Sequence, residues 1–161
     1  FLDSDDKWYS NKLSLQIDYM KTNKIFFSFT SYDIINNNGN PTNKVISVPE
    51  KITHNQYLKN TIIGCLTVII DTKNIRIPLM KDIRTSQDMI LWLEILKNER
   101  YAFGLNQVLA SYRISSNSNT RNKLFAAVDV WRVYRNYERL NIINSFYNFM
   151  QYAFNAIKKR I

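Results

Sequence analysis

The sequence contains little cysteine, histidine, glycine or proline, and it has no long apolar run. The single cysteine, Cys65, excludes an internal disulfide framework. The single histidine, His54, excludes a metal cage built from several histidines. Three glycines and three prolines argue against a loop-rich fold. The longest apolar run, 62–70, is far shorter than the stretch of about 20 residues that crosses a bilayer as a helix.

What is present is the composition of a globular unit with a basic end. Of its 161 residues, 45% are hydrophobic and 14% aromatic, which is enough for one ordinary core. The net charge is +9. Residues 1–99 carry 12 Lys and Arg against 11 Asp and Glu, whereas residues 100–161 carry 10 against 2. A segment so charged attracts phosphates, anionic lipid or nucleic acid.

The most informative cluster is acidic and lies at the start of the chain. Two apolar residues, Phe1 and Leu2, run directly into Asp3, Asp5 and Asp6. Carboxylates this close disfavour one another unless a cation or hydrogen bonds offset their charge, and they suit a hard divalent ion. These residues are compatible with two interpretations. One is a buried strand that ends at Leu2, with the acids at its ligand-binding edge. The other is an acidic loop that caps the next helix.

Helical and strand patterns alternate along the chain, which predicts an α/β fold. The first helix is expected to follow Ser10 and to carry an apolar stripe of Trp8, Leu13, Ile17 and Met20. We further expect strands at 25–31, 45–48, 66–71, 101–105 and 108–114, helices at 53–60, from Ser86 onward and within 123–161 around a break near Asn141, a turn at 36–41 and a polar loop at 115–122.

Gln87 and Asp88 form a second candidate site, in the first turn of the helix that Ser86 begins. An Asp here is favoured by the helix dipole, by roughly 0.3–1 kcal/mol, and needs no other explanation. A carboxylate on a rigid helix start could also act as a general base for an alcohol nucleophile. The catalytic interpretation requires Asp88 to lie near the acidic cluster in space.

Taken together, these segments resemble the family 2 glycosyltransferases, enzymes of the GT-A fold that build bacterial polysaccharides and glycoconjugates. Asp3-Ser4-Asp5 matches the family's Asp-x-Asp motif, and Gln87-Asp88 matches its catalytic pair. The order and spacing of the similar blocks extend from the first residue to about Ser118. These blocks are 1–8, 27–32, 60–68, 86–93 and 105–113.

The resemblance implies a metal-dependent, inverting hexosyltransferase. Asp5 would bind Mn²⁺ or Mg²⁺ together with the donor diphosphate, with Asp3 beside the metal and the ribose and Asp6 near the donor sugar. Such an ion neutralises charge on the departing nucleoside diphosphate. The implied substrates are a nucleotide-sugar donor, most commonly a UDP-sugar, and a saccharide or lipid-linked acceptor.

The remaining site residues also follow from the resemblance. Asp88 would be the catalytic base, with Gln87 and Trp92 contacting the acceptor; for Trp92 the alternative is a place in the core. Gly64 would let the backbone approach the donor, while the neighbouring cysteine only packs. Arg113, near a strand end, would reach the diphosphate, although an exposed strand-end arginine needs no such role.

The resemblance also predicts how the chain is divided. Residues 1–118 are expected to be the C-terminal portion of a GT-A mixed-sheet catalytic domain, followed by a basic, aromatic-rich helical tail at 119–161. The nucleotide-binding half that begins such domains is absent from the sequence. We therefore expect this portion by itself to bind donor poorly and not to turn over.

The tail allows more than one interpretation. A wide apolar face precedes Lys158, Lys159 and Arg160, so the helix could lie on the inner membrane surface of a cytoplasmic enzyme or pack on the catalytic domain. Arginine and tyrosine alternate over 132–139, which would suit a basic nucleic-acid-binding domain. That alternative leaves the acidic cluster unexplained, and no nucleic acid is expected as a partner. A third possibility is an inactive truncated relative that serves as an interaction module.

Overall fold

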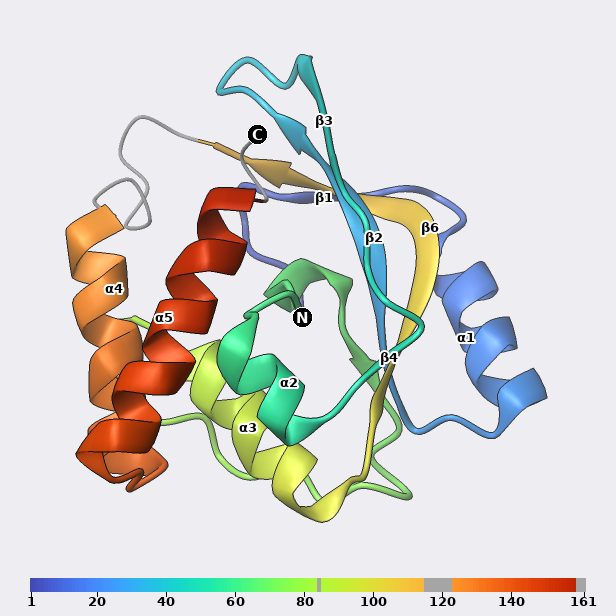
Figure 1. Cartoon of the computed structure of the whole chain (residues 1–161). Helices are drawn as coiled ribbons and strands as arrows, with labels where there is room; N and C mark the ends of the chain where they lie inside the picture. Colours follow the sequence, from blue (N-terminus) through green and yellow to red (C-terminus); the bar gives the residue numbers. More distant parts are fainter. Residues whose placement is uncertain (84, 115–122, 159–161) are drawn as a thin grey trace.

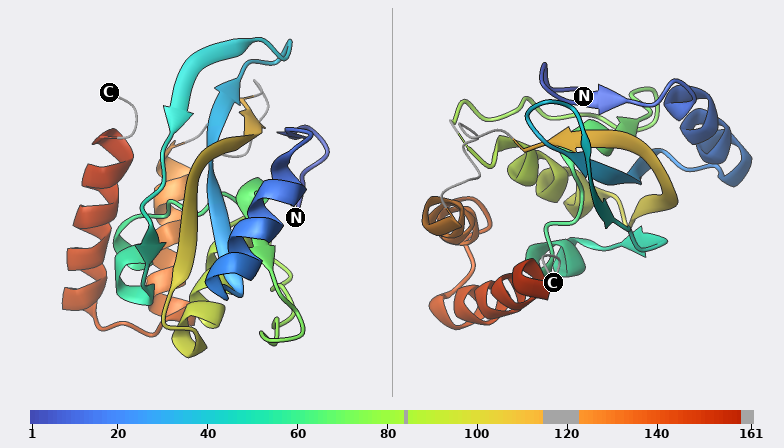
Figure 2. Two further views of the ribbon diagram at one scale, coloured as in Figure 1. Left: turned by 90° about the vertical axis from the view of Figure 1, so that its right-hand side faces the viewer. Right: turned by 90° about the horizontal axis from the view of Figure 1, so that it is seen from above.

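The computed structural model describes residues 1–83, 85–114 and 123–158 and forms a mixed sheet with helices on both sides (Figure 1). Helix α1 lies at one side of the sheet, and α2, α3, α4 and α5 gather on the other (Figure 2). In chain order the elements are β1 Lys7–Trp8, α1 Lys12–Asn23, β2 Phe27–Ile35, β3 Pro41–Ile46, β4 Lys51–Ile52, α2 His54–Lys59, a 3-10 turn Cys65–Thr67, β5 Ile69–Ile70, α3 Gln87–Asn98, β6 Ala102–Arg113, α4 Lys123–Arg132, a π-helical turn Val133–Tyr137 and α5 Ile142–Lys158.

The centre of the sheet is the parallel pair β2 and β6. The strand order is β1-β6-β2-β3, and the short strands β4 and β5 pair antiparallel with β6 and β2. The outer pairs β1–β6 and β2–β3 are also antiparallel. Antiparallel edges around a parallel centre make this a mixed α/β sheet, which confirms the expected fold class.

The core lies between the sheet and the helices α2 to α5. Phe27 and Phe29 of β2 pack with the apolar side of α3, where every residue from Met89 to Leu93 is buried. Val133 and Tyr134, which follow α4, belong to the same core. The helical tail therefore shares its core with the rest of the chain. The expected boundary at 118/119 and the expected loop 115–122 lie outside the described residues.

Several expected elements differ from the structure. The strand expected at 45–48 is β3, Pro41–Ile46, and begins where the expected turn ends. Residues 101–114 form one strand rather than two, because β6 continues through Asn106 with an irregular register against Thr30 and Ser31. Residues 66–71 form a 3-10 turn and a two-residue strand. Phe1 and Leu2 are exposed and lie outside any strand. The helix at 54–59, the helix after Ser86 and the break before α5 are confirmed.

The buried face of α1 is polar, contrary to the expected apolar stripe. Leu13 and Ile17 are exposed, at 47% and 38%, whereas Lys12 and Gln16 are fully buried. The Lys12 Nζ donates to Gln16 Oε1 at 2.6 Å. Gln16 Nε2 in turn donates to Ser28 Oγ at 2.9 Å and to the Thr67 carbonyl at 3.0 Å. These hydrogen bonds hold α1 against β2 and against the turn that follows Gly64.

The buried Lys12 predicts a specific pH dependence of stability. Burial lowers the pKa of Lys12 from its ordinary 10.5 to about 8. Between these values Lys12 holds a proton in the unfolded chain but not in the folded chain, so its contribution to the free energy of unfolding rises with pH across this window. The buried Cys65 thiol, whose pKa is raised from 9.0, contributes in the opposite sense above about pH 9, so the comparison of the two proteins isolates Lys12. Replacing Lys12 by Met should remove the contribution of Lys12. Urea unfolding of both proteins near pH 7.5 and pH 10 measures the difference; parallel pH profiles would contradict it.

Gly104 of β6 marks the closest approach between two backbone segments. Its amide N–H donates to the Glu50 carbonyl at 2.8 Å. A Cβ added at Gly104 would lie 2.0 Å from the carbonyl oxygen of Pro49. This crossing brings the segment before β4 directly onto the central strand, and no residue with a side chain fits there without a shift of the backbone.

Candidate active site

The acidic segment is a turn held at the end of β6. The Asp6 amide donates to the Asp3 carbonyl at 3.1 Å, and the next two residues pair with β6. Asp6 is buried, and its Oδ1 accepts a hydrogen bond from the Arg113 amide at 2.9 Å. Burial, with the neighbouring charges of Asp5 and Asp3, raises the pKa of Asp6 to about 6. Asp5 is exposed. The segment leads into β1, so neither the expected strand end nor the helix cap is present.

Arg113 fixes this segment rather than facing a ligand site. Its guanidinium donates to the Asp5 carbonyl at 2.7 Å and to the carbonyls of Asn36 and Asn37 at 3.1 and 2.9 Å. These bonds tie the acidic turn to the loop between β2 and β3. Arg113 does not line the cleft described below, and its expected contact with a diphosphate stays a prediction.

Asp88 stands in the first turn of α3, as the sequence predicts. The preceding Ser86 adopts a left-handed backbone conformation with φ 60°, an uncommon geometry for a serine. The Asp88 side chain is half-buried, and its burial raises its pKa; the charge of Asp3 raises it further. Backbone N–H groups at the start of the helix offset part of this effect. A carboxylate with a raised pKa in a cleft is suited to accept a proton.

One cleft of about 570 Å³ brings the two acidic segments together. Its wall contains Asp3 and Asp6 from the N-terminal turn, Gln87 and Asp88 from α3, and Gly64 from the loop before the 3-10 turn. Asp88 and the acidic turn therefore line the same cleft, and the catalytic interpretation of Asp88 required them to lie near each other. Asp5 lies beside the cleft but does not line it.

Trp92 belongs to the core and offers no surface to an acceptor. It is 0% exposed, and its ring lies 5.2 Å from that of Phe1 and 5.6 Å from that of Phe27 between centroids. The expectation of sugar stacking at Trp92 is not supported, since a stacking surface has to be exposed. A helical position facing an apolar sheet explains the burial of the ring, although its indole N–H has no hydrogen-bond partner among the described residues.

Gly64 and Cys65 lie on the cleft wall as expected. A Cβ at Gly64 would lie 3.3 Å from side-chain atoms of both Leu66 and Tyr32, so the backbone is closely packed there. Burial raises the pKa of the Cys65 thiol to about 12, which makes it unreactive at neutral pH. The packing role expected for Cys65 agrees with this environment.

Sequence reasoning missed a fourth acidic side chain in the cleft, beside Asp3, Asp6 and Asp88. Asp129 of α4 accepts a hydrogen bond from Thr85 Oγ1 at 2.6 Å, and both residues line the cleft. Tyr152 of α5 lines it as well. The sequence offered one indication of Asp129, because the last third of the chain has only two acidic residues.

The residues present fit a hard divalent ion. Carboxylates are ligands that Mn²⁺ and Mg²⁺ accept, and Asp3 on the cleft wall lies two positions from the exposed Asp5. Within the described ranges, no three side chains of His, Cys, Asp or Glu are grouped so as to hold a metal by themselves. An ion here would therefore take further ligands from a bound molecule, and phosphate oxygens serve this purpose for Mg²⁺.

The basic, tyrosine-rich segment does not form a base-stacking platform. Tyr134 is fully buried and donates its hydroxyl to the Leu58 carbonyl. Arg132 pairs with Asp129 at 3.3 Å, and Arg135 donates to the Leu140 carbonyl. The buried Tyr134 is therefore not available for base stacking, whereas Arg132 and Arg139 remain exposed. Among the helices of the described chain, none is both long and apolar enough to cross a membrane.

The sequence comparisons agree with the geometry of the cleft. No family model matches the chain. TuaG of Bacillus subtilis, named as a teichuronic acid biosynthesis glycosyltransferase, is 47% identical over 161 residues, which are 100% of this chain and 64% of TuaG. Two proteins of Escherichia coli, WfgD and WfaP, are each 39% identical, over 99% and 76% of this chain and 62% and 48% of their own lengths. Both are named UDP-Glc:alpha-D-GlcNAc-diphosphoundecaprenol beta-1,3-glucosyltransferase.

The chain thus spans less than two thirds of the length of these relatives. The similarity nevertheless extends from end to end of the chain for the first two of them, and therefore includes the acidic turn and the start of α3. By sequence, this chain belongs to the same family as these bacterial glycosyltransferases.

Proposed function

We propose that this protein is a metal-dependent, inverting glycosyltransferase of family 2. It transfers a hexosyl unit from a UDP-sugar to a hydroxyl of a lipid-linked or saccharide acceptor. The observation that carries this proposal is the convergence on one cleft of Asp3 and Asp6, from the start of the chain, and Asp88, from the start of α3. The names of WfgD and WfaP, which specify UDP-glucose and a diphosphoundecaprenol-linked acceptor, support the substrate classes.

In this proposal the acidic turn binds the donor diphosphate. Asp5 and Asp3 would hold Mn²⁺ or Mg²⁺, an ion that would supply positive charge to offset the charge of the leaving nucleoside diphosphate. Asp6, fixed by the Arg113 amide, supports the turn and borders the donor sugar. Gly64, where the backbone lines the cleft without a side chain, lets the donor approach closely.

Asp88 accepts the proton of the acceptor hydroxyl. The oxygen so released attacks the anomeric carbon, and the bond between that carbon and the diphosphate oxygen breaks, so the anomeric configuration inverts. The raised pKa of the half-buried Asp88 brings this base closer to the operating pH, which favours proton transfer. The exposed Gln87 next to it is placed to contact the acceptor.

Binding of UDP with Mn²⁺ to the full-length gene product tests the donor site. At a ligand concentration of about 100 Kd, binding should stabilise the protein by about 2.7 kcal/mol, and only when both UDP and the ion are present. Replacing Asp5 by Ala should abolish the metal-dependent part, because the turn loses one of its two exposed carboxylates. Thermal unfolding with UDP, with Mn²⁺ and with both measures this effect.

The matched control is Asp18→Ala, which removes another exposed aspartate, on α1. This variant should respond to UDP and Mn²⁺ as the unchanged protein does. Equal stabilisation of Asp5→Ala and Asp18→Ala would place the donor diphosphate elsewhere and would contradict the assignment of the acidic turn.

A further inference from the structure

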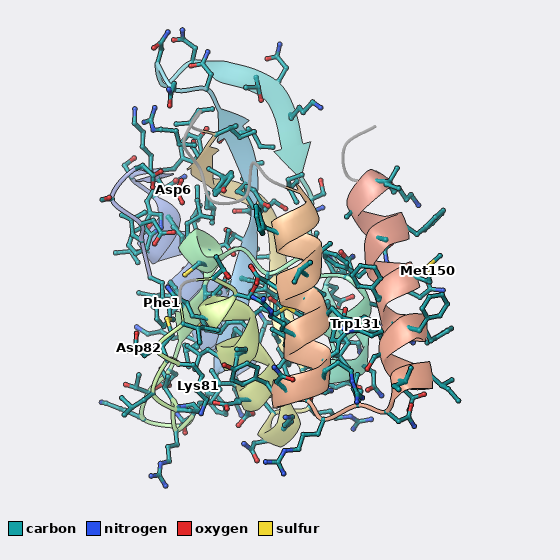
Figure 3. The ribbon with its side chains drawn as sticks, turned by 90° about the vertical axis from the view of Figure 1, so that its left-hand side faces the viewer. Phe1, Asp6, Lys81, Asp82, Trp131 and Met150 are labelled. Carbon is teal, nitrogen blue, oxygen red and sulfur yellow. The ribbon has the colours of Figure 1, made fainter. Side chains whose placement is uncertain are left out.

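Helix α5 is turned so that its apolar face points away from the protein. Ser145 and Asn148 are buried, whereas six apolar side chains on the opposite face are between 53% and 79% exposed. This outer stripe consists of Ile143, Phe146, Tyr147, Met150, Phe154 and Ile157. In Figure 3, Met150 points outward from α5, whereas Trp131 lies between α4 and α5. A helix that only packed on the catalytic domain would bury its apolar face and expose its polar face.

The contacts of the inner face fix this orientation. Asn155 donates its side-chain amide to the Lys59 carbonyl of α2 at 3.0 Å. Phe149 packs edge-on against Trp131 of α4, with 5.7 Å between ring centroids. These contacts with α2 and α4 hold the inner face of α5 against the rest of the chain, so the outer stripe faces outward.

Basic side chains border the outer stripe. The Lys59 ammonium lies 5.1 Å from the ring centroid of Tyr147. The exposed Arg139 precedes α5, and the exposed Lys158 ends it. The stripe itself contains no charged residue, and the chain from residue 100 onward carries an excess of eight positive charges. An apolar stripe bordered by cations is complementary to a surface of anionic headgroups over acyl chains.

We propose that α5 binds the surface of an anionic membrane, with the outer stripe inserted at the boundary between headgroups and acyl chains. At 17 residues the helix is about 25 Å long, a length suited to lie in the plane of the interface. An isolated apolar stripe of this size is otherwise unfavourable in water, since soluble monomers rarely expose such contiguous patches. The proposal rests on α5 itself and does not require the transfer reaction.

Membrane binding through α5 has a consequence for the cleft, and this step does rest on the proposed function. Tyr152, on the inner side of α5, lines the cleft, while Met150 lies on the outer stripe. One helix, about 10–12 Å across, therefore separates the cleft wall from the proposed membrane contact. A lipid-linked acceptor held in the same membrane would meet the cleft without leaving the bilayer.

Flotation with vesicles tests the proposal on the full-length protein, without donor or acceptor. The vesicles contain equal parts of phosphatidylglycerol and phosphatidylcholine, and vesicles of phosphatidylcholine alone serve for comparison. The protein should float with the anionic vesicles, and less so at high salt, because salt screens the basic border. The double variant Phe146→Gln/Phe154→Gln should lose at least about tenfold in partition coefficient, because two aromatic side chains no longer insert.

The matched control is Val45→Gln/Leu79→Gln, which changes two apolar side chains that are 52% and 90% exposed and lie outside α5. This control should float like the unchanged protein. Equal flotation of both double variants, or no flotation with anionic vesicles, would overturn the proposal. A dimer that Phe146→Gln/Phe154→Gln converts to a monomer would overturn it in favour of a second copy on the stripe. Because no substrate is present, these results are independent of whether the protein transfers sugar.

Discussion

Replacing Asp88 by Asn is expected to lower kcat for sugar transfer by about 10²- to 10⁴-fold, because the amide cannot accept the proton of the acceptor hydroxyl. Asn keeps the shape of the side chain, so stability and the affinity for UDP with Mn²⁺ should change little. Steady-state transfer kinetics on the full-length protein, together with UDP binding, measure both effects. A loss of donor affinity that matches the loss of rate would assign Asp88 to binding instead of catalysis.

The pH profile gives a second readout of the same residue. A general base has to be deprotonated, and burial raises the pKa of Asp88 above its ordinary 3.8. The activity of the unchanged protein should therefore fall on the acidic side at a higher pH than an exposed aspartate would give. Asp129→Asn, which removes a different carboxylate from the cleft, should leave this fall of activity at low pH unchanged. If the fall disappears in Asp129→Asn and persists in Asp88→Asn, the base is Asp129.

Replacing Gly104 by Ala is expected to destabilise the fold by about 3 kcal/mol or more, at the upper end of the usual cost of overpacking. The added Cβ would lie 2.0 Å from the Pro49 carbonyl oxygen, so two backbone segments have to separate. The shift would also weaken the hydrogen bond from the Gly104 amide to Glu50. Urea unfolding monitored by tryptophan fluorescence measures the difference.

Gly64→Ala is the matched control for this substitution. A Cβ there meets only the side chains of Leu66 and Tyr32, at 3.3 Å, and side chains adjust more readily than backbone. Gly64→Ala should therefore cost clearly less stability than Gly104→Ala. Equal losses from the two substitutions would mean that the crossing at Pro49 is flexible enough to accept a methyl group.

The sequence predicted those helices and strands whose own residues form a recognisable local pattern. Helix α3 begins after Ser86 as expected, because its apolar residues follow a helical period and Asp88 favours a first turn. Helix α1 has the predicted position but the opposite inner face. There, hydrogen bonds from Gln16 to β2 and to the turn after Gly64 decided the orientation, and these partners are distant in sequence.

In the site, too, local motifs could be predicted from the sequence, whereas contacts with residues distant in sequence could not. The acidic turn and Asp88 were predicted from their motifs, and the cleft confirms that they lie together. The environments of Arg113 and Trp92 were not predictable, because they depend on which carbonyls and rings surround them in the folded chain. Asp129 was missed for a similar reason, since only the packing of α4 brings it to Thr85.

The parallel pairing of β2 with β6 also constrains how the chain folds. Phe29 lies opposite Gly104, and the two centre strands cannot pair until both have been synthesised. Contacts between residues so far apart in sequence close slowly, because the entropy of the intervening loop is lost before the contacts form. Until then, the apolar residues of β2 and its unpaired edge remain accessible to other chains. The central pair that places the acidic turn beside α3 thus also leaves β2 without its partner until β6 has been synthesised.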